Sequence, residues 1–175
     1  MDTRRLSSIK KIHRLIAITL VLLISAGSID TVSAARQMRK PMTRRDKCPV
    51  CGMFVYKYPK WVAIVEFTDG TSFFYDGAKD MFKHYMNVPK YSPGKSLQNI
   101  MHVHVTDYYA VALLDAKEAL YVIGSNVLGP MGHELIPFKD QASAQEFLED
   151  HKGTRILRFQ DVTEETIRAL DAAQQ

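Results

Sequence analysis

Residues 61–75 read WVAIVEFTDGTSFFY and contain the strongest local folding signal in the chain. The first part, Trp61 to Phe67, is rich in the β-branched and aromatic residues that favour strands. Asp69-Gly70 is typical of a tight hairpin turn, and Thr71 to Tyr75 has the composition of a returning strand. The stretch therefore predicts an antiparallel β-hairpin.

The residues after the hairpin predict a helix and a third strand. Asp76 is suited to be the N-cap of a helix over 78–86, in which apolar residues share one face and His84 is expected on the exposed side. Residues 87–98 hold two prolines and a glycine and predict a loop. Residues 100–106 alternate between apolar and polar types, as in a strand. The predicted order is ββαβ.

The second half of the chain repeats this order after roughly 65 residues, a period too long for a solenoid repeat. Its main difference is a long loop between the first two strands, where the first half has a two-residue turn. The fold class predicted is α+β, with two similar ββαβ lobes packed together after an N-terminal signal peptide. The expected elements are strands over 108–114 (or a continuation of the preceding strand), 119–123, 134–138 and 154–161, a helix over 141–151 capped by Asp140, and a final helix capped by Thr163.

The chain begins with the features of a secretory signal peptide. Basic residues precede an apolar run over 15–26, and Val32-Ser33-Ala34 forms a small-x-small cleavage pattern. The run of about 12 residues is shorter than the ~20 that a membrane-spanning helix needs. We therefore expect residues 1–35 to be cleaved and the protein to be periplasmic or otherwise exported, with an uncleaved membrane anchor as the alternative.

Charge and length limit the function classes. Residues 1–35 carry five basic and two acidic side chains, so their removal lowers the formal charge from +4 to +1. That balance does not indicate a nucleic-acid partner. We expect a flexible lead-in at 36–46, a first lobe at 47–106 and a second lobe at 107–175.

Both cysteines lie in residues 47–53, which read KCPVCGM. A disulfide between Cys48 and Cys51 would close too short a loop to constrain the unfolded chain, so the pair indicates redox or metal chemistry. A thioredoxin-like redox pair would stand at the start of a helix, and the residues after Cys51 lack helical periodicity. A zinc site would need two more ligands, such as His102 and His104. Thiolates and thioethers together favour Cu(I).

A second stretch, residues 128–134, reads LGPMGHE and contributes further candidate ligands. Met131 lies between glycines in the long loop, which is not a typical setting for a core methionine, and long loops in compact folds are usually functional. We expect this loop to meet the cysteine stretch and hold copper, with His133 as a nitrogen ligand or as a contact to one. No catalytic constellation stands out, so we do not expect an enzyme.

Three motifs together resemble the NosL family, accessory proteins of nitrous-oxide reductase assembly: residues 48–53, Phe74-Tyr75-Asp76-Gly77 and Gly129-Pro130-Met131-Gly132. The resemblance implies a periplasmic Cu(I) metallochaperone that delivers copper to an exported apoprotein. That apoprotein could be nitrous-oxide reductase, reached through its membrane maturation complex, or another exported enzyme. Membrane contact is then expected only through the signal or a partner. The implied ligands are Cys51, Met53 and Met131, with Cys48 as a second thiol that could join or replace Cys51.

This chain departs from the family in one feature. Family members are typically lipoproteins, and no cysteine follows the apolar run at the predicted cleavage site of this chain. Two alternative functions remain from the residues alone. They are a thiol–disulfide oxidoreductase that uses Cys48 and Cys51, and a structural zinc-binding interaction module.

Overall fold

The computed structural model describes residues 40–173, so the predicted signal peptide and its cleavage site lie outside the described residues. Residues 40–173 belong to one compact unit. In the described part of the expected lead-in, the carboxylate of Asp46 accepts a 2.6 Å hydrogen bond from the backbone N–H of Thr43. Within residues 40–173 no helix has the length and apolar character needed to span a bilayer.

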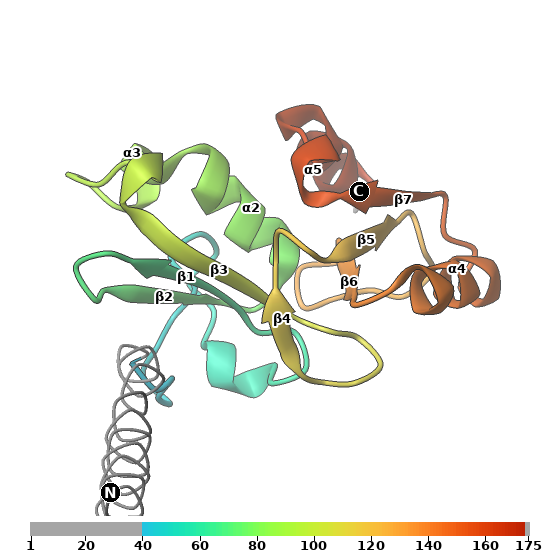
Figure 1. Ribbon diagram of the computed structural model, residues 1–175, viewed down its shortest axis with the longest axis horizontal. Coiled ribbons are helices and arrows are strands. Elements are labelled where there is room, and N and C mark those ends of the chain that lie inside the picture. The colour runs from blue at the N-terminus through green and yellow to red at the C-terminus, as the bar shows by residue number, and fades with distance from the viewer. Residues whose placement is uncertain (1–39, 174–175) are drawn as a thin grey trace, which may run out of the picture. The chain divides into compact units, whose positions relative to one another are not determined.

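The predicted hairpin forms one half of a four-stranded antiparallel sheet, and its second strand lies at the sheet edge (Figure 1). Strand β1 (Ala63–Phe67) pairs on one edge with β2 (Ser72–Tyr75) and on the other with β3 (Ile100–Thr106). Gly70 has φ +82° in the connecting turn, a conformation that glycine adopts without a steric penalty. The hairpin and the third strand are confirmed.

The fourth strand of this sheet differs from the expectation. Residues 108–110 form a turn in which the Asp107 carboxylate accepts hydrogen bonds from the N–H groups of Tyr109 (3.0 Å) and Ala110 (2.7 Å). Aspartate commonly stabilises turns in this way. Strand β4 therefore spans only Leu113–Asp115 and pairs with β3. It joins the first sheet although it lies in the stretch assigned from sequence to the second lobe.

Helix α2 (Ala78–Met86) packs against the first sheet through buried side chains that include Met81 and Phe82. The exposed position expected for His84 is wrong. Its ring is fully buried, with Nδ1 2.5 Å from the Tyr75 hydroxyl and Nε2 2.9 Å from the Ser92 hydroxyl. The predicted loop that follows contains a short helix, α3 (Val88–Tyr91), and Ser92 directly after it supplies one of these partners.

Helix α3 has a proline in its first turn. The backbone N–H groups of a first turn have no acceptor within the helix, so the missing N–H of proline breaks no hydrogen bond there. A 3-10 turn, η3 (Leu97–Asn99), then leads into β3.

The second sheet has β5 (Leu120–Ile123) between β6 (Ile136–Phe138) and β7 (Arg155–Arg158), all antiparallel. Helix α4 (Gln141–Asp150) covers it, and the Asp140 carboxylate accepts a 2.9 Å hydrogen bond from the N–H of Ser143, as a predicted N-cap should. After a 3-10 turn, η4 (Phe159–Asp161), Thr163 caps α5 (Glu164–Ala172).

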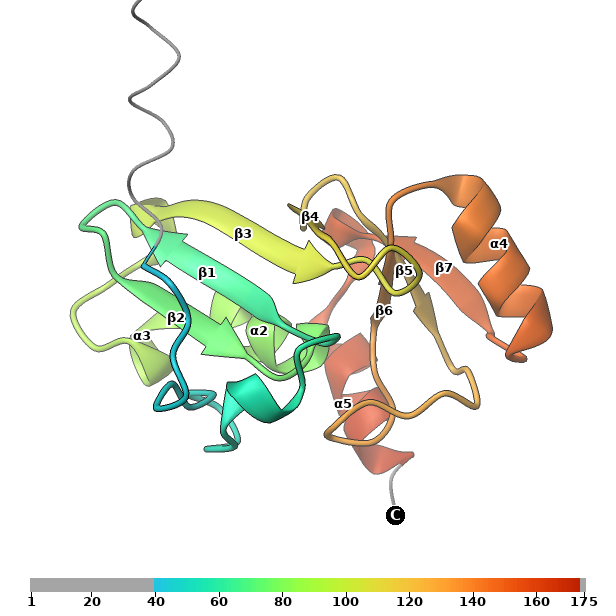
Figure 2. The ribbon, with the colours of Figure 1, turned by 90° about the horizontal axis from the view of Figure 1, so that it is seen from below.

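The ββαβ order therefore occurs twice, and the α+β class is confirmed. Figures 1 and 2 show α2 against the first sheet and α4 beside the second. Helix α5 contacts α2, and its Ile167 and Leu170 belong to the larger apolar core, which contains residues of both lobes. A smaller apolar cluster lies between α4 and the second sheet. The first turn of α2 is thus reached by segments from both lobes.

Candidate metal centre

The cysteine stretch is a closed turn that directs both sulfur atoms to one side. An isolated bridge between Lys47 and Phe54 joins its ends. Within it, the N–H of Cys48 donates to the carbonyl of Met53, and the N–H of Gly52 donates to the carbonyl of Cys48, both at 2.9 Å. A single 3-10 turn, η2 (Val55–Lys57), follows, so no α-helix begins directly after Cys51.

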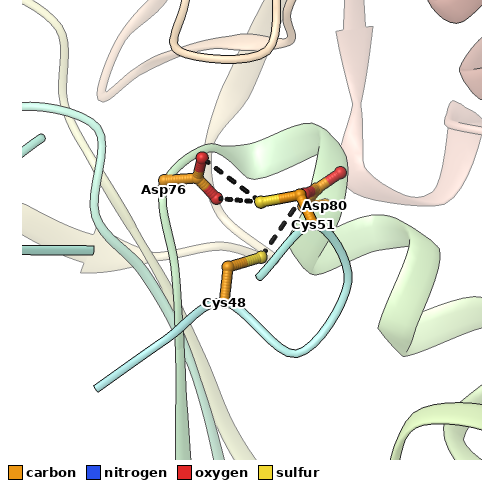
Figure 3. Close-up of side chains that lie close together, drawn as sticks. All are labelled: Cys48, Cys51, Asp76 and Asp80. Atoms are coloured by element: carbon orange, nitrogen blue, oxygen red, sulfur yellow. Dashed lines mark hydrogen bonds between the residues drawn. The ribbon is translucent and has the colours of Figure 1, made fainter. Parts of the chain in front are cut away.

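The two thiols meet two carboxylates at the start of α2 (Figure 3). Sγ of Cys48 lies 3.3 Å from Oδ2 of Asp80, and Sγ of Cys51 lies 3.2 Å from Oδ1 of Asp76. One potential ligand atom from each of the four residues lies within 4.8 Å of the others. Cys51 is half-buried and the other three are buried. This arrangement can hold a metal ion.

The sequence did not indicate either aspartate as a site residue. It assigned Asp76 to the N-cap of α2, and this is wrong, because the N-cap is Gly77 and has no side-chain cap. Instead, Oε1 of Glu134, from the second lobe, accepts the N–H of Lys79 at 2.6 Å. Asp76 is therefore directed to Cys51. The four-residue spacing of Asp76 and Asp80, about one helical turn, was the available signal.

The environment keeps both thiols protonated when no metal is bound. Burial raises the pKa of Cys51 to about 12, and its hydrogen bond to Asp76 adds to the increase. Burial, with the nearby negative charge of Asp80, raises the pKa of Cys48 well above its usual range. Backbone N–H groups of the turn oppose these increases. The N–H of Met53 lowers the pKa of the Cys51 thiol, and the N–H groups of Cys51 and Val50 lower the pKa of the Cys48 thiol.

A bound cation would reverse this balance. It would favour the thiolate forms, and the N–H donors that already face the sulfur atoms would stabilise them further. The donor set of two thiols therefore fits a soft metal ion, which takes the place of the protons.

The Met131 loop reaches the same end of α2. Gly129 and Gly132 pair with each other, which leaves Pro130 and Met131 at the tip of the loop. The carbonyl of Met131 accepts a 2.9 Å hydrogen bond from Nζ of Lys79, the residue immediately before Asp80. The structure thus brings the two predicted stretches to one helix turn.

The remaining candidates are placed as follows. Met53 and Met131 are half-buried, and their ligation of a metal stays a prediction. His133 is half-buried in the loop and lies outside the group of thiols and carboxylates. His102 and His104 lie on β3, also outside that group, and Nε2 of His104 is 3.4 Å from Glu66.

The fold and this site define an α+β protein of two small antiparallel sheets with a thiol–carboxylate site at a helix start. The sequence model of the NosL family matches residues 39–167, so the chain belongs to the NosL family, as its motifs predicted. A crystal structure of the copper chaperone NosL from Shewanella denitrificans is similar, with a TM-score of 0.62 and 21% identity over 72% of this chain and 96% of that chain. Comparison with curated proteins gives no match.

Proposed function

We propose that the protein is an exported Cu(I) chaperone. The observation that carries the proposal is the convergence of Cys48, Cys51, Asp76 and Asp80 on the helix turn to which the Met131 loop is tied. Membership of the NosL family, and a similar structure that is described as a copper chaperone, support copper as the cargo.

The ligands proposed for Cu(I) are Cys51, Met53 and Met131, with Cys48 as a second thiol. Thiolate and thioether are soft donors that suit Cu(I), whereas thioether is a poor zinc ligand. In the metal-free protein the thiols donate hydrogen bonds to Asp76 and Asp80. Each thiol that binds copper must lose its proton, so uptake releases protons to solvent.

The burial of the four residues suits transfer of copper to another protein. Cys48 is only 1% exposed, whereas Cys51 is half-buried beside the exposed Gly52. The ligands of an acceptor protein would approach from the Cys51 side and take the ion by ligand exchange. No bond in a substrate is made or broken, so we do not propose an enzymatic activity.

The acceptor we propose is an apoprotein outside the cytoplasm, such as nitrous-oxide reductase or its membrane maturation complex. This part of the proposal rests on the resemblance of the motifs together with the predicted signal peptide. Contact with the membrane would come only through the signal or through a partner. We propose no contact with nucleic acid.

Anaerobic competition titrations of the reduced mature protein against a Cu(I) chelator test the proposal. We expect one Cu(I) per chain. Cys51→Ser should lose much Cu(I) affinity, and Met131→Ala should lose less. The loss of Cu(I) affinity in Met131→Ala should still exceed any change in its Zn(II) affinity. Met81→Ala is the control: it removes a fully buried side chain, so it should cost roughly 2–5 kcal/mol of stability and leave Cu(I) affinity unchanged.

The same titrations can contradict the assignment. If Met131→Ala binds Cu(I) as tightly as the parent, the site does not span the two stretches. If the parent shows no Cu(I) binding, the chaperone function is wrong.

A further inference from the structure

A buried contact between the lobes holds the loop that carries Met131. The Lys79 side chain is fully buried, and its Nζ donates to the Met131 carbonyl at 2.9 Å and lies 3.1 Å from Oδ1 of Asp171 on α5. Glu134 at the end of the loop is 3% exposed. Its Oε1 accepts the backbone N–H groups of Lys79 (2.6 Å) and Leu135 (3.0 Å).

The Met131 loop and the first turn of α2 also approach each other closely, which leaves little room for a side chain at two glycines. A Cβ atom at Gly77 would lie 2.1 Å from Oε2 of Glu134. A Cβ atom at Gly129 would lie 3.1 Å from Cγ of Glu134 and 3.3 Å from Cζ3 of Trp61. A Cβ atom at Gly77 would therefore displace Glu134, whereas one at Gly129 would require a neighbouring side chain to shift by only a few tenths of an ångström.

An ionic network continues this contact to the thiol site. Asp171 also pairs with Lys83 at 3.0 Å, and Lys83 lies 3.3 Å from Oδ1 of Asp80. Asp80 in turn accepts the Cys48 thiol. The backbone at Met131 and the carboxylate beside Cys48 are thus linked through Lys79, Asp171 and Lys83.

We propose that Lys79 and Glu134 are positioning residues that hold Met131 against the first turn of α2 and so set the geometry of the copper site. This inference rests on the proposed function, because it assumes that Met131 binds copper. A buried lysine is costly unless it is paired, and apolar side chains would join two lobes at lower cost. A directed hydrogen bond to the backbone of Met131 instead fixes where that residue lies.

The test compares Cu(I) affinities of variants of the mature protein under anaerobic competition. Lys79→Met removes the charge and the hydrogen bond but keeps the length of the side chain, and it leaves Asp171 paired with Lys83. We expect a loss of about 10- to 100-fold, the range for outer partners of metal ligands. Phe147→Leu, in the apolar cluster under α4, is a control that lowers stability without changing Cu(I) affinity.

Glu134 provides a second pair of variants if Lys79→Met does not fold. Burial raises the pKa of Glu134 to about 8, so its carboxyl is largely protonated near neutral pH. Glu134→Gln keeps an acceptor for the N–H of Lys79 and should lose less affinity than Glu134→Leu. Equal losses in the two variants would show that the hydrogen bond has no role in positioning.

A double-mutant cycle shows whether Lys79 acts through Met131. If it does, Lys79→Met should have little further effect on affinity in the Met131→Ala background. Full additivity would overturn the proposal, as would unchanged affinity in Lys79→Met when the parent binds Cu(I).

Hydrogen exchange gives a readout that needs no copper. In metal-free Lys79→Met the amides of Gly129 and Gly132, which are hydrogen-bonded across the loop, should exchange faster than in the parent. Unchanged exchange would overturn the proposal. If the parent binds no Cu(I), the proposed function fails, and exchange still reports whether Lys79 holds the loop.

Discussion

The thiols of the metal-free protein should react slowly with alkylating reagents, because only the thiolate is nucleophilic. With a pKa of about 12, Cys51 would be about 10⁻⁴ thiolate at pH 8, against about 0.2 for a free cysteine of pKa ~8.5. A more basic thiolate is intrinsically a better nucleophile, by about 40-fold for this difference. The net expectation is that Cys51 reacts about 50-fold more slowly than an unperturbed thiol.

The assay is a time course of iodoacetamide labelling of the reduced, metal-free protein, followed by mass spectrometry. The same protein unfolded in urea serves as the reference. Cys48 should react more slowly still, because it is 1% exposed and its pKa is raised further. Asp76→Asn should increase the rate at Cys51, since the Asp76 carboxylate accepts the thiol hydrogen and raises the thiol pKa.

A native rate at Cys51 within about 5-fold of the unfolded rate would refute this reasoning, because it would mean that the folded protein does not raise the thiol pKa. A native rate faster than the unfolded rate would indicate an activated thiol and would favour the thiol–disulfide oxidoreductase alternative. An insulin-reduction assay distinguishes the copper chaperone from a thiol–disulfide oxidoreductase directly. We expect only background activity, and activity lost specifically in Cys48→Ser would favour the redox function.

Three further predictions concern the rest of the chain. Asp140→Ala should lower the free energy of unfolding by roughly 0.5–2 kcal/mol in urea denaturation, because the N-cap bond to Ser143 is lost; no change would mean that the cap contributes nothing. Burial lowers the pKa of His84 from 6.5 to about 4, so the unfolded chain binds the extra proton and stability should fall by up to about 3 kcal/mol between pH 6.5 and 4. The slope in that window should be smaller in His84→Asn, and an equal slope would exclude His84 as its cause. Protein from a periplasmic extract should begin at residue 35 or 36 by N-terminal sequencing, whereas recovery only in membranes with Met1 intact would indicate an uncleaved anchor.

Features that depend only on neighbouring residues could be predicted from the sequence. Asp69-Gly70 specifies a turn because glycine accepts positive φ there, and Asp140 and Thr163 cap helices through N–H groups only three residues away. The alternation over 100–106 likewise reflects the two faces of a single strand. Such short-range rules were enough to obtain the repeated ββαβ order.

Local rules failed where a distant segment supplied the partner. His84 has the position of an exposed helix residue, yet Tyr75 and Ser92 satisfy its ring nitrogens, so it is stable in the interior. Because of the turn at Asp107, β4 begins later in the chain than expected. It pairs with β3 in the first sheet, although it follows the expected boundary between the lobes.

The site shows the same division most clearly. The sequence predicted the cysteines and Met131 as candidate ligands from their side-chain chemistry, but it assigned Asp76 to a local cap. In the folded protein Glu134, 55 residues after Lys79, accepts the helix N–H, and Asp76 faces Cys51 instead. The sequence does not predict this, because a helix start accepts any carboxylate that reaches it, and the packing of the two lobes determines which carboxylate lies there.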